Sequence, residues 1–233
     1  METKLVDFKP TCGNMLSGVG PAAIEMGLIT AIGDSAEVKI RAVNTGARIV
    51  ARVQIQDGMP RYDGSAQIDG VPGSAAPVEL NFMNVAGSST GAFLPSGNLI
   101  DSFEGVEVTC MDVAMPMVIA RAADFGLTGA ETREELDANR DFFAKMETVR
   151  LAAGAAMGMG DCSRSVTPKF GLLYPVEGAG HIGARYFMPW ETHPTMAVTG
   201  SQALASCALT PGTIADKMMT IPKERPAKIT LPH

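Results

Sequence analysis

Short stretches in which apolar and polar residues alternate dominate the chain. Residues 37–43 alternate in this way, residues 44–46 (Asn-Thr-Gly) have the composition of a tight turn, and residues 48–55 are apolar enough for a half-buried return strand. Further strands are predicted at residues 78–83, 106–110, 117–121, 170–174, 184–188 and 228–231. Because no repeated strand–helix–strand unit connects these strands, the pattern favours antiparallel sheet.

Three segments show the pattern of helices. Residues 128–154 predict one amphipathic surface helix with a capping residue at Thr128 or Thr132. A second helix is predicted to follow residues 12–14 and run to Gly27, and a third to follow residues 199–201 and run to residues 211–212. These last two carry a single charged residue between them, Glu25. A helix that is apolar on every side is enclosed on every side, so we expect each to lie buried within a curved sheet.

Small polar residues at 86–91 and 94–98 mark a boundary between two similar parts of the chain. We therefore predict two units, residues 1–90 and 91–233, which share the layout of strands followed by a buried helix. The predicted fold class is α+β, with two pseudo-symmetric units, each a curved and mostly antiparallel sheet around a buried central helix.

Composition, charge and cysteine spacing exclude several classes of protein. The chain has 233 residues, a net charge of −6 and 46% hydrophobic residues, which argues against disorder and against a nucleic-acid or anionic-membrane partner. No apolar run approaches the roughly 18 residues of a membrane span, and the N-terminus is unlike a signal peptide, so a cytoplasmic location is expected. The four cysteines form no CxxC pair and the three histidines no HExxH motif, which argues against a disulfide framework and a metal site.

Cys12 is the first residue whose surroundings suggest chemistry. It precedes a predicted helix, where unpaired backbone N–H groups and the helix dipole stabilise a thiolate suited to acid–base catalysis. Gly13 lets the backbone approach a ligand, and Asn14 is able to cap the helix or bind a carboxylate. A free cysteine is also a common apolar core residue, and for the other three cysteines this is the expected role.

Thr199, Gly200 and Ser201 form a second candidate site at the start of the third predicted helix. Backbone N–H groups and hydroxyls meet there and either bind an anion or simply cap the helix. Two buried helices that both begin with ligand-capable turns suggest a cleft between the units that holds one anionic substrate. His193 is expected either to bind a substrate carboxylate or to cap a neighbouring turn.

Three further features are candidates for contacts to the same ligand. Residues 112–116 (Asp-Val-Ala-Met-Pro), which include Met115, follow a predicted strand and either reach the cleft or form a turn. Lys169 and Arg185 are candidate cationic contacts or solvated surface charges.

At these residues the chain resembles the methylaconitate isomerase (PrpF-like) family, with the greatest likeness to 4-oxalomesaconate isomerases, also called tautomerases. The resemblance extends over nearly the whole chain. It rests on CGN at residues 12–14, LSGVGP at 16–21, DGVPG at 69–73, GVEVTCMD at 105–112, MGMGD at 157–161, VTG at 198–200 and PGT at 211–213.

The resemblance implies a diaminopimelate epimerase-like fold and cofactor-independent isomerisation of an unsaturated oxo-tricarboxylate in the breakdown of aromatic acids. A proton leaves a carbon activated by an adjacent oxo or carboxylate group and is returned two carbons away as the double bond moves. Cys12 occupies the family's catalytic cysteine position. The expected substrate-binding residues, taken from the motifs and the resemblance together, are Gly13, Asn14, Met15, Met115, His193, Thr199, Gly200 and Ser201. A small polycarboxylate is the expected partner, and the sequence leaves open whether the protein forms a homodimer.

The chain departs from the family pattern at both ends. Only eleven residues precede Cys12, where the family has a longer stretch with a catalytic lysine, and Lys4 and Lys9 do not stand in that motif. We therefore expect residues 1–90 to be the C-terminal part of a first epimerase-like unit, residues 91–233 to be a second unit that lacks its C-terminal part, and the chain alone to have little activity.

Other functions are compatible with parts of the sequence. Isomerisation of a related acid, such as 2-methylaconitate or 3-methylitaconate, is the first alternative. Amino-acid epimerisation on the same fold needs a second cysteine just before the third predicted helix, where Ala197 and Val198 stand and Cys207 comes about two turns too late. An inactive fragment or a binding domain is the non-enzyme alternative.

Overall fold

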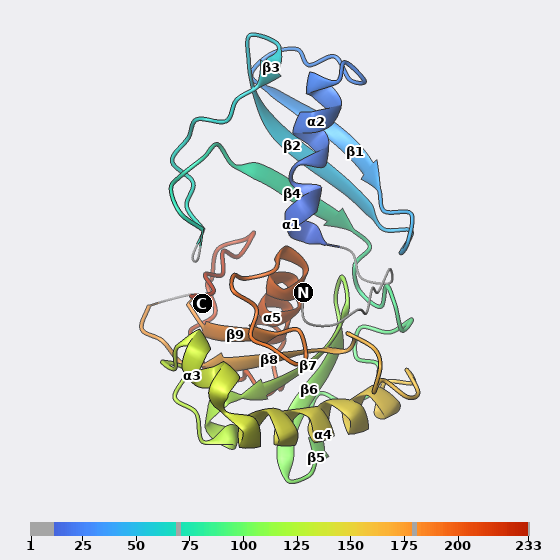
Figure 1. Ribbon diagram of the computed structural model, residues 1–233, viewed down its shortest axis with the longest axis vertical. Coiled ribbons are helices and arrows are strands. Elements are labelled where there is room, and N and C mark those ends of the chain that lie inside the picture. The colour runs from blue at the N-terminus through green and yellow to red at the C-terminus, as the bar shows by residue number, and fades with distance from the viewer. Residues whose placement is uncertain (1–11, 69–70, 179–180, 233) are drawn as a thin grey trace. The chain divides into compact units, whose positions relative to one another are not determined.

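The computed structural model describes residues 12–68, 71–178 and 181–232 (Figure 1). Its contacts divide the chain into an N-terminal unit, Phe8–Val85, and a C-terminal unit that begins at Ala86. Lys4, Lys9, Asp69 and Gly70 lie outside the described residues. No described helix is long and apolar enough to cross a membrane.

The N-terminal unit is an antiparallel sheet with two short helices. Strand β2 is central, because it pairs with each of the other three strands. The elements are α1 (Gly13–Leu16), α2 (Val19–Glu25), β1 (Ser35–Arg41), β2 (Arg48–Gln56), β3 (Met59–Pro60) and β4 (Val78–Met83). Alternation along β1 and β2 turns Val38, Ala51 and Val53 toward Ile24 of α2, which forms the core of this unit.

The predicted continuous helix from residue 15 to Gly27 is wrong. The structure has two helices, separated at Ser17 and Gly18. Pro21 explains the break, because its ring collides with a helical carbonyl four residues earlier, at Ser17, and is tolerated only in a first turn. The helix is also not enclosed on every side, since α2 buries one face while Val19 is 41% exposed.

The C-terminal unit has a five-stranded sheet with a helix layer on each face (Figure 1). All strand pairs are antiparallel except β7 with β8, which are parallel. The strands are β5 (Asp101–Phe103), β6 (Val106–Asp112), β7 (Pro116–Arg121), β8 (Lys169–Tyr174) and β9 (Gly183–Phe187). The helices are η1 (Ala122–Phe125), α3 (Arg133–Ala138), α4 (Arg140–Ala156) and α5 (Val198–Leu209).

The two helix layers use opposite faces of this sheet. Phe142 and Met146 of α4 pack on the face that carries Phe170 and Leu172. On the other face, Leu204 of α5 lies so close to Gly171 that an added Cβ there would be 2.8 Å from its Cδ2 atom. No residue of α5 is exposed, which confirms the predicted buried helix in this unit.

Two further predictions need correction. The single helix predicted within residues 128–154 is divided at Asn139, whose side chain accepts a hydrogen bond from Phe142 N and so starts α4 as a new helix. Thr132 caps α3 in a capping box with Glu135, which confirms one of the two candidate caps. The strand predicted at residues 228–231 is absent, and Thr230 forms only an isolated bridge with His181.

Candidate functional site

Cys12 lies at the surface of the N-terminal unit, directly before α1. Its carbonyl accepts the first helical hydrogen bond, from Leu16 N at 3.2 Å, and its side chain makes no capping bond. Asn14 and Met15 are exposed as well, whereas Gly13 is buried. Because α1 has only four residues, it is too short for the helix-dipole argument that the sequence suggested. Cys12 differs from the other three cysteines because it is exposed.

The other three cysteines are buried in the C-terminal unit. Burial raises the pKa of Cys207 to about 11, and burial together with the nearby Asp101 carboxylate raises the pKa of Cys110 far above its ordinary value. Such thiols stay protonated and out of reach of a ligand, which agrees with a core role. Cys12 is therefore the one exposed thiol of the four.

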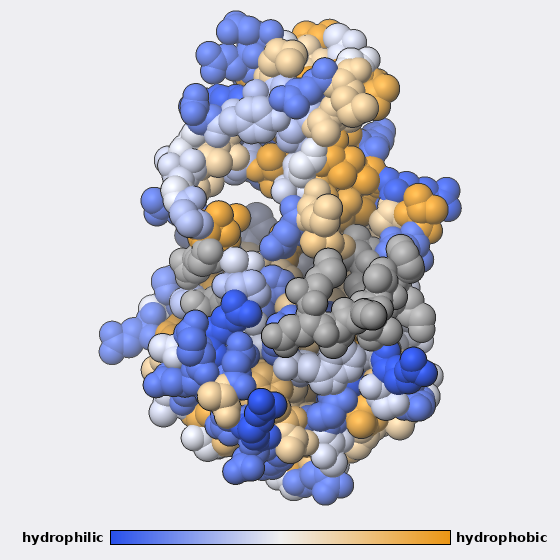
Figure 2. All heavy atoms as spheres, in the orientation of Figure 1, coloured by the Kyte–Doolittle hydropathy of each residue, from blue (hydrophilic) through white to orange (hydrophobic). Residues whose placement is uncertain are grey.

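Exposed apolar side chains lie along α1, along α2 and just after α2. Figure 2 shows hydrophobic residues over α1 and α2, whereas the surface over α3 and α4 is mainly hydrophilic. Met15 is 76% exposed, Met26 72% and Leu28 71%. An unsaturated ligand that bore carboxylates would find apolar contacts for its carbon skeleton at this surface.

Helix α5 begins at Val198, earlier than predicted, so Thr199, Gly200 and Ser201 belong to its first turns. No side chain caps this end of the helix. Ser201 Oγ donates to the Val198 carbonyl at 2.8 Å within its own turn, so simple N-capping by a hydroxyl is wrong for this helix. Thr199 is 4% exposed, and its Oγ1 donates to Met115 Sδ at 3.7 Å.

Tyr186 on β9 joins these residues to the rest of the predicted set. Its hydroxyl donates to Met115 Sδ at 3.7 Å, and its ring centroid lies 5.3 Å from that of His193. The ring also lies against Gly200, where an added Cβ would be 2.8 Å from Tyr186 Cε2. The sequence did not indicate a functional role for Tyr186, because a tyrosine in a buried strand has the pattern of an ordinary core residue. Three predicted binding residues of the C-terminal unit, Met115, His193 and Gly200, thus contact one buried ring.

His193 is fixed in orientation next to this ring. Its backbone N donates to the Tyr186 carbonyl at 2.8 Å, and its Nδ1 accepts a hydrogen bond from Thr195 N at 3.1 Å. A ring nitrogen that accepts a hydrogen bond carries no proton, so Nε2 holds the proton of the neutral imidazole. Of the two sequence-based roles, the structure shows the contact within a neighbouring turn, because Nδ1 accepts a hydrogen bond from Thr195 N, and the binding of a substrate carboxylate stays a prediction.

The glycine at position 200 is required by the close approach of Tyr186. We expect Gly200→Ala to lower the free energy of unfolding by about 1 kcal/mol, because an overpacking cost of about 1–3 kcal/mol exceeds the gain of about 1 kcal/mol in helix propensity. Chemical denaturation measures this difference. Ser201→Ala is the neighbouring control and should change the same quantity by less than about 0.5 kcal/mol. A Gly200→Ala protein more stable than the wild type would contradict the packing described above.

The other sequence candidates have structural roles. Asp112 is fully buried at the end of β6, and its Oδ2 accepts hydrogen bonds from Ser89 N, Thr90 N and Thr90 Oγ1 at 2.7–2.9 Å. It therefore anchors the segment that leads into the C-terminal unit. Arg185 donates to Tyr174 Oη at 2.8 Å and to the Glu131 carbonyl at 3.3 Å, and Lys169 is only 8% exposed, so neither is a solvated surface charge.

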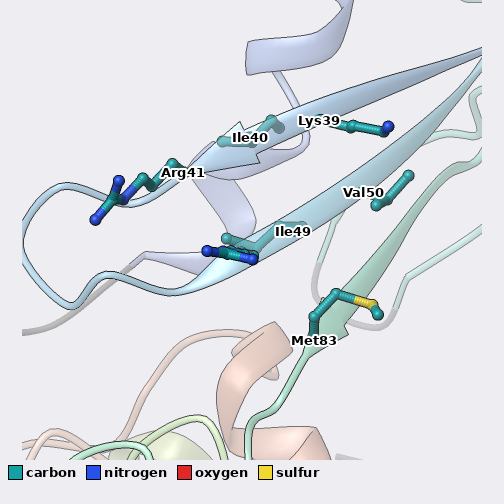
Figure 3. A pocket seen from close by; sticks show the side chains of 7 residues that line it. Lys39, Ile40, Arg41, Ile49, Val50 and Met83 are labelled. Carbon is teal, nitrogen blue, oxygen red and sulfur yellow. The ribbon is translucent and has the colours of Figure 1, made fainter.

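No cluster of three or more metal-ligating side chains occurs among residues 12–68, 71–178 and 181–232. A cavity of about 260 Å³ opens on the sheet of the N-terminal unit, and none of the predicted site residues lines it (Figure 3). The roles of Cys12, Gly13, Asn14 and Met15, and of the residues around Tyr186, stay predictions.

Comparison with known proteins gives a consistent result. A family model described as PrpF protein matches residues 1–233. The chain is 42% identical over 233 residues to the (4E)-oxalomesaconate Delta-isomerase of Novosphingobium sp. strain KA1, covering 100% of this chain and 65% of that protein. It is similar to a crystal structure of methylitaconate-delta-isomerase, with a TM-score of 0.83, 29% identity and coverage of 98% of this chain and 65% of the other.

A second solved structure bears on the fold alone. The chain is similar to a hydroxyproline epimerase from Agrobacterium vitis, with a TM-score of 0.50, 14% identity and coverage of 87% of this chain and 54% of the other. Together with the mixed strands and helices, this likeness confirms the predicted α+β, epimerase-like fold class. The chain spans about three fifths of the length of the curated relatives it matches.

Proposed function

Because the chain belongs to the PrpF protein family, we propose that the whole protein is an isomerase that moves a carbon–carbon double bond in an unsaturated oxo-tricarboxylate, 4-oxalomesaconate. The relative from Novosphingobium, whose name states this reaction, matches the chain from end to end. The observation that carries the proposal is the exposed thiol of Cys12, the one accessible cysteine, in the position that the family resemblance assigns to proton transfer.

The proposed reaction needs only proton transfers. The Cys12 thiolate removes a proton from a carbon next to the oxo group, which leaves a dienolate. The dienolate is then protonated two carbons away, and the double bond has moved with no change of composition or oxidation state. A positioned acid–base group of this kind accelerates proton transfer by roughly 10²–10⁴-fold.

Residues of the C-terminal unit supply groups suited to an anionic intermediate. The first turn of α5 has no side-chain cap, and the His193 ring lies next to Tyr186, whose ring contacts Gly200 of this turn. Backbone N–H groups at the start of a twelve-residue helix favour negative charge. Fixed donors of this type stabilise a dienolate more than the neutral ketone from which it forms.

The structure disfavours epimerisation as the alternative. An epimerase of this fold would need a second reactive cysteine at the start of α5, where Ala197 stands. Cys207 is fully buried in the second half of α5, and burial raises its pKa to about 11. Isomerisation of a related acid remains the second candidate, because the methylitaconate isomerase structure resembles this chain with a TM-score of 0.83.

We propose a cytoplasmic location on the basis of the cysteines. None of the four forms a disulfide within the described part of the chain, and three of them are buried. Proteins that keep unpaired thiols are typical of a reducing compartment.

Proton NMR in D₂O tests the proposed reaction. We expect the whole protein to convert one 4-oxalomesaconate isomer into another and to introduce deuterium at the carbon that receives the proton. Turnover of 3-methylitaconate without turnover of 4-oxalomesaconate would select the second candidate. A purified, folded protein that isomerises neither acid would overturn the proposal.

A further inference from the structure

None of the residues assigned to the proposed reaction lines the cavity on the sheet of the N-terminal unit (Figure 3). Its volume is about 260 Å³, which suits a small molecule. Strands β1, β2 and β4 supply all of its lining: Lys39, Ile40, Arg41, Arg48, Ile49, Val50 and Met83.

Strand register places three positive charges around the apolar floor of this cavity. Arg41 is paired with Arg48, which is paired in turn with Met83 on its other side. Two residues further along, Lys39 is paired with Val50. Because side chains alternate along a strand, these five residues lie on one face of the sheet, and the core residue Val38 lies on the opposite face. We call these five residues the cationic pocket.

The positive charge of the cationic pocket has no compensating acid. No side-chain hydrogen bond or ion pair joins Lys39, Arg41 or Arg48 to another residue within the described part of the chain, and all three are exposed. The next row of the same face is different, because there Arg52 lies 3.9 Å from Glu79. Like charges directly opposite each other destabilise a strand pair, so the Arg41–Arg48 pair has a cost that a bound anion would offset.

We propose that the cationic pocket binds a small carboxylate ligand that carries a short hydrocarbon segment. The planar guanidinium groups of Arg41 and Arg48 match the two oxygens of a carboxylate, and the Lys39 ammonium is able to hold a second one. Val50 and Met83 provide the apolar surface on which the carbon segment packs. This site is separate from the proposed catalytic function and stands whether or not that function holds.

Methionine methyl NMR of the 24.4 kDa chain tests the proposal, with tricarballylate as the probe. The Met83 methyl signal reports on the cationic pocket, and the Met115 methyl signal reports on the cluster around Tyr186. We expect the Met83 signal to shift and saturate as tricarballylate is added. Arg48→Gln should weaken this binding about tenfold, and Arg52→Gln, a control on the same strand and face, should weaken it less than twofold.

Three outcomes would overturn the proposal. The first is a Met83 signal that stays fixed, whether or not the Met115 signal moves. The second is equal weakening by Arg48→Gln and Arg52→Gln, which would show a general attraction to the sheet. The third is inorganic phosphate binding as tightly as tricarballylate, which would show that the hydrocarbon floor plays no part. Both arginines are exposed, so an unchanged unfolding midpoint establishes that each variant is folded.

Discussion

Replacement of Arg150 by methionine is expected to lower the free energy of unfolding by about 3–5 kcal/mol. Arg150 lies in α4 and is completely buried. Its guanidinium binds both carboxylate oxygens of Glu147 at 2.7 and 2.8 Å. It also donates to the carbonyls of Cys162, Ser165 and Pro168 at 3.1–3.3 Å. One side chain therefore attaches the segment before β8 to the helix that covers the sheet.

The size of this effect follows from what the substitution leaves behind. Methionine fills much of the same volume but donates no hydrogen bond, so three carbonyls and a partly buried carboxylate lose their partner in a place where water cannot replace it. Chemical denaturation followed by circular dichroism measures the loss. Arg140→Met is the control in the same helix, because Arg140 is exposed, and it should cost less than about 0.5 kcal/mol. Equal losses for the two variants would contradict the role given to Arg150.

Arg150 also shows where sequence reasoning fails. Its position within a charged stretch of an amphipathic helix reads as a solvated surface residue. The three carbonyls that accept its hydrogen bonds lie 12 to 18 residues later, in a loop whose course no periodic pattern predicts. The sequence pattern favours antiparallel sheet, but β7 and β8 are parallel, because α3 and α4 form a single strand–helix–strand crossover, which leaves no repeated pattern in the sequence.

Local sequence patterns predicted individual strands and helices more accurately. The strands predicted at residues 37–43, 48–55 and 78–83 correspond to β1, β2 and β4, and Thr132 was one of two candidate caps. Thr199 and Gly200 were predicted to stand at a helix start, and the structure places them in the first turn of α5. Tyr186, which contacts Met115, His193 and Gly200, was not found, since its importance lies in contacts between distant segments. The sequence thus predicted the presence of most elements better than their ends or the side chains packed between them.

Replacement of Cys12 by alanine is expected to lower the turnover of 4-oxalomesaconate by about 10²–10⁴-fold, the contribution typical of a positioned acid–base group. The substitution removes the proposed proton-transfer atom and little else, because the side chain is exposed and makes no capping bond. The free energy of unfolding should therefore change by less than about 0.5 kcal/mol. Steady-state kinetics of the whole protein, followed by NMR, together with denaturation of the same sample, measure the two quantities separately.

Cys110→Ala serves as the matched control, because it should lower stability and leave turnover unchanged. Cys110 is fully buried in β6, and its raised pKa keeps the thiol protonated. Its loss should cost about 1 kcal/mol of stability through a small cavity while turnover by the folded protein is retained. If Cys12→Ala kept wild-type turnover, the thiol would have no part in proton transfer. The polar groups next to Tyr186, with His193 foremost, would then be the place to seek the catalytic acid, because an allylic shift cannot proceed without a group that moves the proton.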